Sequence, residues 1–231
     1  MKEFEVRKIF FISAWSALFS VVAVVIWIVS MIVFQAPEGT PEEQLVFLYN
    51  RGLMAGVPFL NAFILSVLQL PVFAGVFILI RPVAPVAALA GSLAGLVYVT
   101  YSSLAYWLQY VMVIRFPELY VNAADALLKN SIEQHYFLVG SFMQHTFIYA
   151  ADQLGYLMLA LASLILGKAL LYLDRAAGAA LIVSGVLGAG GAAGYLTAVP
   201  WLEFGNILSG AAYLLYLAFV CRLFWGIRQV N

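Results

Sequence analysis

Long apolar runs separated by short polar breaks form the pattern of this chain. A helix needs about 20 apolar residues to cross the hydrocarbon core of a membrane, and six runs reach that length. They cover residues 9–34, 53–80, 83–114, 150–173, 176–199 and 201–225. Proline or charge interrupts the chain between runs, and the runs lack the alternating pattern of membrane strands. The pattern predicts an all-α, polytopic membrane protein with a single transmembrane domain of six helices over residues 1–231.

The first run could also be the core of a secretory signal, because Lys2, Arg7 and Lys8 precede it. Signal-peptide cores contain roughly 7 to 15 apolar residues and lead into a small-residue cleavage site. Residues 9–34 form a longer run, and no clear cleavage site follows. We therefore expect a retained first span whose N-terminal side lies in the cytoplasm.

Charge is distributed unevenly between the two sides that this topology defines. Only Arg51, Arg115 and Lys129 fall on the outer side. The cytoplasmic side carries Lys2, Arg7, Lys8, Arg81, Lys168, Arg175, Arg222 and Arg228. Because cytoplasmic loops carry an excess of Lys and Arg, the distribution predicts that both termini are cytoplasmic.

Composition narrows the function classes. The chain is 65% hydrophobic and 10% charged, which is too apolar for one soluble core. The scattered basic residues form no patch for a phosphate backbone, so we expect no nucleic-acid partner. A single cysteine, Cys221, and two histidines provide no cluster with metal-ligand spacing. We predict neither a metal site nor a cofactor.

The outer segment between the third and fourth spans contains a helical pattern of its own. Within "PELYVNAADALLKNSIEQ", apolar residues share one helical face and charged residues recur at four-residue steps on another. The apolar set is Leu119, Leu127, Leu128 and Ile132, and the charged set is Asp125, Lys129 and Glu133. This predicts a short amphipathic helix at the outer interface; a polar loop with some helix is the alternative.

Polar residues within spans are the candidates for function, because ionisable groups at membrane depth tend to face the bundle interior. Ser141, His145, Tyr149, Asp152 and Tyr156 follow steps of three or four residues, so one helix would place them on one stripe. The alternative is that Asp152 marks the outer water boundary and His145 lies in the headgroup layer.

The other spans contribute polar residues to the same outer half. On the third span, Tyr106, Trp107 and Tyr110 fit an interfacial aromatic belt, whereas Tyr101 lies deeper. We predict an outward-facing ligand pocket, with interhelical hydrogen bonding alone as the alternative. Its candidate residues are Asn61, Tyr101, Gln109, His145, Tyr149, Asp152, Glu203 and Asn206.

Four glycines are candidates for close helix packing. Gly91 and Gly95 form a small-xxx-small pair on the third span, and Gly190 and Gly194 form another on the fifth. Such residues let helix backbones approach closely. They could serve the bundle itself, a homo-oligomer or a membrane-protein partner.

Enzyme functions lack the required residues. A haem held by His135 and His145 on one helix is geometrically poor, because axial ligands must come from opposite sides. Ser141 is a weak candidate nucleophile for a hydrolytic site. We expect a non-enzymatic protein that binds a lipid-like or small apolar ligand, or a partner helix, through the outer half of the bundle. The alternatives are a small transporter or channel using His145, Asp152 and Glu203, and an enzyme with His145 as acid or base.

Three segments of the chain resemble one family. They are "LILIRPVAPVAALAGSLAGLVYVTYSS", "LMLALASLILGKALLYLDRAAGAALIVSGVLG" and "AAYLLYLAFVCRLFWGIR". They look like parts of the bacterial six-helix membrane family catalogued as domain of unknown function 4386. The resemblance implies a six-helix bundle in contact with the lipids of a prokaryotic cytoplasmic membrane, and implies no activity.

Overall fold

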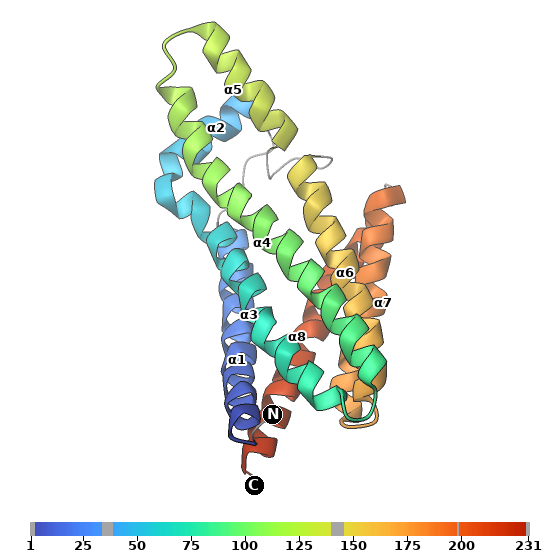
Figure 1. Cartoon of the computed structure of the whole chain (residues 1–231). Helices are drawn as coiled ribbons and strands as arrows, with labels where there is room; N and C mark the ends of the chain where they lie inside the picture. Colours follow the sequence, from blue (N-terminus) through green and yellow to red (C-terminus); the bar gives the residue numbers. More distant parts are fainter. Residues whose placement is uncertain (1–2, 34–38, 140–145, 198, 230–231) are drawn as a thin grey trace.

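The structure, a computed structural model, describes residues 3–33, 39–139, 146–197 and 199–229. These residues form helices without a strand (Figure 1). The elements are α1 (Glu3–Val33), α2 (Pro41–Arg51), the 3-10 helix η1 (Gly52–Gly56), α3 (Val57–Ile80), α4 (Pro85–Val121), α5 (Ala126–Val139), α6 (Phe147–Leu170), α7 (Arg175–Thr197) and α8 (Pro200–Gln229). Six of them, α1, α3, α4, α6, α7 and α8, are long and apolar enough to cross a membrane. The predicted fold class of an all-α, six-helix membrane bundle is confirmed at this level.

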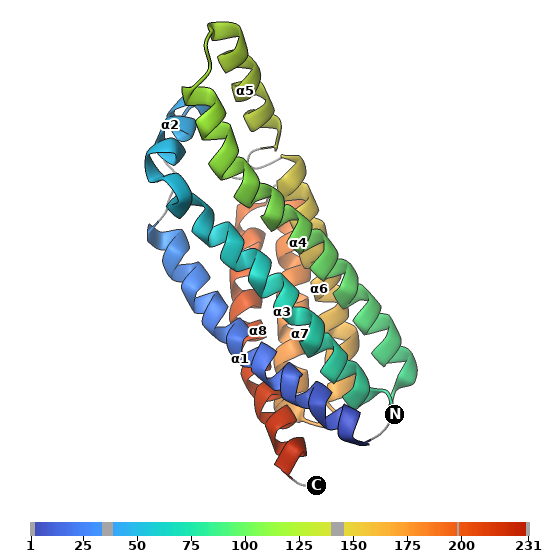
Figure 2. The ribbon, with the colours of Figure 1, turned by 60° about the vertical axis from the view of Figure 1, so that its left-hand side comes forward.

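The six long helices form a ring in chain order. Each packs against the next, from α1 through α3, α4, α6 and α7 to α8, and α8 contacts α1. The two chain ends and the α3–α4 and α6–α7 turns lie at one end of the bundle, called here the terminal end (Figure 2). The helices α2 and α5 lie at the opposite end, called here the insert end (Figure 1).

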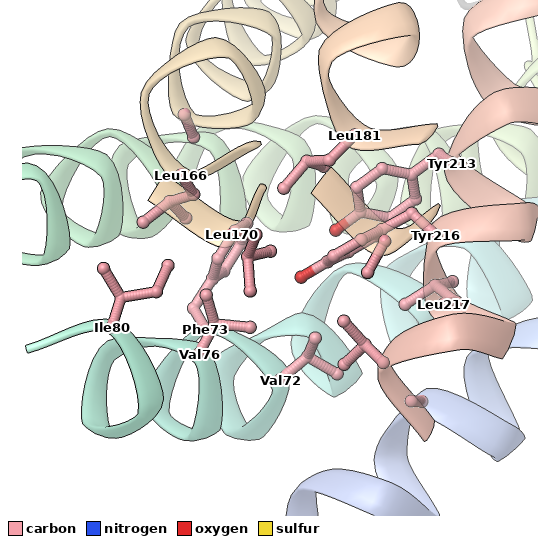
Figure 3. Close-up of a cluster of buried hydrophobic side chains, with 14 of the residues drawn as sticks. Val72, Phe73, Val76, Ile80, Leu166, Leu170, Leu181, Tyr213, Tyr216 and Leu217 are labelled. Atoms are coloured by element: carbon pink, nitrogen blue, oxygen red, sulfur yellow. The ribbon is translucent and has the colours of Figure 1, made fainter. Parts of the chain in front are cut away.

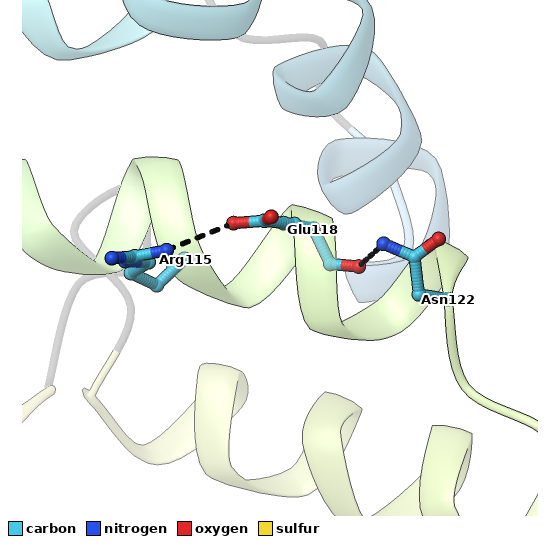
Figure 4. A network of polar contacts seen from close by, with 3 residues as sticks. All are labelled: Arg115, Glu118 and Asn122. Atoms are coloured by element: carbon cyan, nitrogen blue, oxygen red, sulfur yellow. Dashed lines mark hydrogen bonds and ion pairs between the residues drawn. The ribbon is translucent and has the colours of Figure 1, made fainter.

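The spans differ from their predicted limits mainly at the insert end. Helix α4 runs on to Val121 and includes Pro117. At 1.5 Å per residue its 37 residues extend about 55 Å, well beyond a hydrocarbon core of about 30 Å. At its end, the Asn122 side chain donates to the Glu118 carbonyl at 2.9 Å, and Arg115 lies 3.2 Å from the Glu118 carboxylate (Figure 4). Hydrophobicity alone ended this span too early, because the added turns contain Arg115, Pro117 and Glu118.

Only the part of the predicted insert helix from Ala126 on lies on α5, which packs on α2 and α4. Ile132 and Tyr136 are buried there beside Leu45 and Leu48 of α2. The Tyr136 hydroxyl donates to Gln44 Oε1 at 3.3 Å, and burial raises the pKa of Tyr136. On α5, Ile132 is covered and Leu127 and Leu128 are exposed, whereas Leu119 lies exposed on α4, so the four predicted apolar residues do not form one helical face. The prediction omitted Tyr136, four residues after Ile132, which contributes the largest buried surface of the packed face of α5.

The terminal end is closed by matching turns and an apolar core. The Ile80 carbonyl accepts from the amides of Val83 and Ala84, and the Leu170 carbonyl accepts in the same way from Leu173 and Asp174. Asp174 Oδ1 accepts from the Ala177 amide at 2.9 Å at the start of α7, which lowers the pKa of Asp174, and Oδ2 pairs with Arg222 at 2.9 Å. Above these turns the interior contains fully buried aliphatic side chains (Figure 3): Val72, Val76, Ile80, Leu166, Leu170 and Leu217.

Candidate functional site

Asp152 is a buried carboxylate in the half of α6 that lies toward the insert end. Thr146 caps this helix, with its hydroxyl accepting from the Tyr149 amide at 3.3 Å, so Asp152 lies less than two turns inside it. Its side chain is 8% exposed. Within the described part of the chain, none of the ion pairs formed by lysine or arginine involves this carboxylate. An ionisable group at such depth is a candidate for function because desolvation makes it costly.

Two tyrosines direct a hydrogen-bond chain to one oxygen of this carboxylate. The Tyr106 hydroxyl of α4 donates to Asp152 Oδ2 at 3.4 Å. The Tyr156 hydroxyl lies 2.9 Å from the Tyr106 hydroxyl. Since the Tyr106 proton is used toward Asp152, Tyr156 is the donor in the second bond. The chain therefore runs from Tyr156 through Tyr106 to Oδ2, and Oδ1 has no partner among the described residues.

Gln109 places a second unpaired acceptor in the same α4–α6 interface. It lies on α4 between Ala105 and Met112, which form a buried cluster with Ile148 of α6. Ile148 and Asp152 are one turn apart on α6. Gln109 is 4% exposed, and its Oε1 atom has no hydrogen-bond partner in the described chain. The interface thus contains two buried oxygens that can only accept.

Close packing ends this polar region on the side of the terminal end. A Cβ atom added at Gly155 would lie 2.6 Å from the Ser102 hydroxyl oxygen, so α4 and α6 approach closely three residues beyond Asp152. Ser102 is fully buried. The Asp152 and Gln109 oxygens therefore lie above a closed helix contact, on its insert side.

Most of the other unpaired buried side-chain atoms in the described chain are hydroxyl oxygens. Besides Asp152 Oδ1 and Gln109 Oε1, the described residues include one more unpaired side-chain acceptor, Asn206 Oδ1, together with hydroxyls. The hydroxyls belong to Ser92, Ser102, Ser103, Ser163 and Tyr216. A hydroxyl is also a donor and rotates to suit its surroundings, whereas a carboxylate or amide oxygen only accepts. Asp152 Oδ1 and Gln109 Oε1 are thus two acceptors without a donor that lie in one helix interface, between α4 and α6.

The structure brings together only part of the predicted pocket. Gln109 and Asp152 share the α4–α6 interface. Tyr149 instead contacts the Tyr195 ring of α7, with centroids 4.9 Å apart. Asn206 of α8 donates to Gln153 Oε1 of α6 at 3.3 Å.

Two more predicted pocket residues lie away from this interface. The Asn61 side chain donates to the Ala23 carbonyl at 2.6 Å and joins α3 to α1. Tyr101 is 37% exposed on the outside of α4. His145 lies outside the described residues, as does the Glu203 side chain. The residues named for one pocket therefore occupy several helix interfaces.

Sequence reasoning missed the role of Tyr106, which fits an interfacial aromatic belt by its position alone. In the structure it is 8% exposed and points into the bundle, whereas its neighbour Trp107 is 45% exposed. The available signal was spacing: Ser102, Tyr106 and Gln109 recur every three or four residues and form one face of α4.

A second polar cluster lies deeper and is fully paired. Gln69 of α3 donates to the Ser20 hydroxyl of α1 at 2.9 Å and accepts from the Tyr213 hydroxyl of α8 at 2.9 Å. All three helices are thereby joined across the ring. Because the oxygen and nitrogen of Gln69 are both used, this cluster has a structural role.

The predicted packing glycines divide into two kinds. A Cβ at Gly91 would meet Leu166 of α6 at 2.5 Å, and one at Gly95 would meet the Phe73 ring of α3 at 2.8 Å. Gly194 is buried. A Cβ at Gly190 would find no atom within 4 Å, so this glycine faces open space on α7.

Comparison of the chain with protein-family models, curated proteins and solved structures gave no match.

Proposed function

We propose that this multi-pass membrane protein is a non-enzymatic binder of a lipid-like or small apolar ligand, held at the α4–α6 interface toward the insert end. One observation carries the proposal: Asp152 Oδ1 and Gln109 Oε1 are buried acceptors without donors among the described residues. A buried polar group left unsatisfied costs about 1–3 kcal/mol. A ligand that supplies donors would offset that cost for both oxygens.

The apolar surroundings of these acceptors favour a ligand that is mostly hydrocarbon. Met112 and Ile148 are buried beside Gln109, and Leu108 and Phe116 pack against the same cluster. Ligand sites are commonly lined by apolar side chains with a few polar groups that fix orientation. A lipid-like molecule fits this combination, with its polar head at Asp152 and its apolar part beside Met112.

Transport is the alternative that needs a polar path to the terminal end. Between Asp152 and that end, the described interior contains first the Gln69 cluster, whose amide is hydrogen-bonded on both sides. The aliphatic core around Ile80 and Leu170 follows. This favours binding from the insert side over passage through the bundle.

We also propose an orientation and a membrane. The excess of basic residues on the side of the termini favours a cytoplasmic terminal end, so that α2 and α5 would face outward. The resemblance to the domain of unknown function 4386 family favours a prokaryotic cytoplasmic membrane. Membrane lipids would then be the natural source of the ligand, and a homo-oligomer or a membrane-protein partner stays a prediction.

Native mass spectrometry of the protein purified from its own membrane tests this function. We expect the wild-type chain to retain a lipid-sized adduct, and Asp152→Asn to lose at least nine-tenths of it. Asp174→Asn is the matched control, since it makes the same change in the α6–α7 turn at the terminal end. Wild-type spectra without an adduct, or equal adducts in both variants, would contradict the proposal.

A further inference from the structure

The polar head of the ligand can be specified from the chemistry of the α4–α6 interface. This step rests on the proposed function. We infer that the head is a protonated amine, which pairs with the Asp152 carboxylate and donates to Gln109 Oε1. The ligand would accordingly be a cationic amphiphile, a long-chain amine rather than a neutral or anionic lipid.

The charge around Asp152 provides the first argument. Three tyrosines, Tyr98, Tyr106 and Tyr156, interact with it electrostatically, and a tyrosine supplies no positive charge. None of the ion pairs among the described residues includes it. Carboxylates within membranes are found paired with a cation or another polar partner. Among the described residues, no cation pairs with Asp152, so a ligand can supply one.

The number of donors that the site requires provides the second argument. Asp152 Oδ2 is served by Tyr106, while Asp152 Oδ1 and Gln109 Oε1 both lack a donor. Both side chains are more than nine-tenths buried. An ammonium group carries three donors, whereas a hydroxyl carries one. A single ammonium head therefore carries enough donors for both acceptors, and an alcohol head does not.

The pairing is also favourable because the site is buried. A charge buried without a counter-ion is strongly destabilising, and adding the partner restores much of that loss when hydrogen bonds complete the geometry. The Tyr156–Tyr106 chain, with oxygens 2.9 Å apart, already holds one carboxylate oxygen in place. Binding an amine therefore requires little rearrangement of Asp152.

Three probes of equal chain length test this inference on the full chain in phosphatidylcholine nanodiscs: dodecylamine, dodecanol and dodecanoate. Binding is measured as specific adducts in native mass spectra, with nanodiscs that hold no protein defining the partition of each probe into the bilayer. We expect wild-type protein to bind dodecylamine at least tenfold more tightly than dodecanol, with no specific dodecanoate binding. Asp152→Asn should abolish the preference, Asp152→Glu should retain part of it, and Asp174→Asn should leave it unchanged.

The outcomes separate this inference from the proposed function. Equal binding of dodecanol and dodecylamine, or an amine preference that survives in Asp152→Asn, would overturn the amine head while ligand binding stands. If none of the probes binds and the wild-type protein also lacks a native adduct, both proposals fail. Thermal unfolding of each variant checks that it is folded, and Gln109→Leu, which should weaken amine binding several-fold, provides a test that does not alter the carboxylate.

Discussion

The Tyr106 hydroxyl and the Asp152 carboxylate join α4 to α6 through a buried hydrogen bond of 3.4 Å. The bond uses one carboxylate oxygen and leaves the other without a partner in the described chain. The contact thus fixes the orientation of Asp152 and leaves one oxygen available to a ligand. The proposed ligand site depends on this geometry.

Removing the Tyr106 hydroxyl should loosen this arrangement. In Tyr106→Phe, Asp152 loses its donor and Tyr156 loses its acceptor, so we expect destabilisation by about 1–3 kcal/mol. Ligand retention should fall as well, because the carboxylate is no longer oriented. Tyr101→Phe removes a hydroxyl from an exposed side of the same helix and serves as the control. Equal thermal unfolding temperatures for the two variants would show that the Tyr106 bond contributes little.

One glycine from each predicted pair, substituted by alanine, leads to an opposite expectation for stability. Gly91→Ala places a methyl 2.5 Å from the buried Leu166 side chain, and overpacking of this kind typically costs about 1–3 kcal/mol. Gly190→Ala meets no neighbour within 4 Å, and alanine is better than glycine in a helix by up to about 1 kcal/mol. Unfolding in detergent should therefore be easier for the first variant and harder for the second. A marked loss of stability or of oligomers in Gly190→Ala would instead place a second protein chain at that face.

The Gln69 cluster should be important for stability and not for ligand binding. In Gln69→Leu, the Ser20 and Tyr213 hydroxyls lose a shared partner that links three helices. We expect a loss of about 1–3 kcal/mol, with the ligand adduct retained per folded molecule. Ser163→Ala is the comparison, since its buried hydroxyl has no partner and its removal should be nearly neutral. Loss of the adduct in folded Gln69→Leu protein would extend the ligand site to this cluster.

Asp174 should make stability depend on pH in the acid range. The Ala177 amide and, next, Arg222 lower its pKa in the folded state. A carboxyl whose folded pKa lies below the unfolded value of about 3.9 contributes stability above that value. The contribution disappears as the pH falls through the folded pKa. As the pH falls from 6 to about 3, the thermal unfolding temperature of the wild-type protein should therefore decrease more than that of Asp174→Asn. Parallel curves of unfolding temperature against pH for the two proteins would contradict the expectation.

The architecture was predictable from sequence because run length and hydrophobicity are properties of single segments. The six helices follow from them, whereas the limits of α4 do not, since Pro117 and the polar turns after it continue the helix. Part of the insert helix was predicted from its periodicity, but its buried side depends on Tyr136 meeting Gln44 of α2, a residue 92 positions away. Such a contact is set by tertiary packing.

Only the two central residues of the candidate site, Asp152 and Gln109, were predictable from the sequence. Asp152 and Gln109 stand out in any apolar span, and both lie in the α4–α6 interface. In the sequence, the type and position of Tyr106 do not distinguish it from a tyrosine at the membrane interface. Only the orientation of α4 in the structure shows that it faces Asp152. Asn61 and Tyr101 were grouped with them by depth alone, yet the ring places them on other faces of the bundle.

A cryo-electron microscopy map of the protein extracted with its native lipids is the decisive test of a ligand at the α4–α6 interface. We predict an elongated density there, with its head within hydrogen-bonding distance of Asp152 Oδ1 and Gln109 Oε1. An interface packed solid with side chains, in which Asp152 and Gln109 satisfy each other directly, would contradict it.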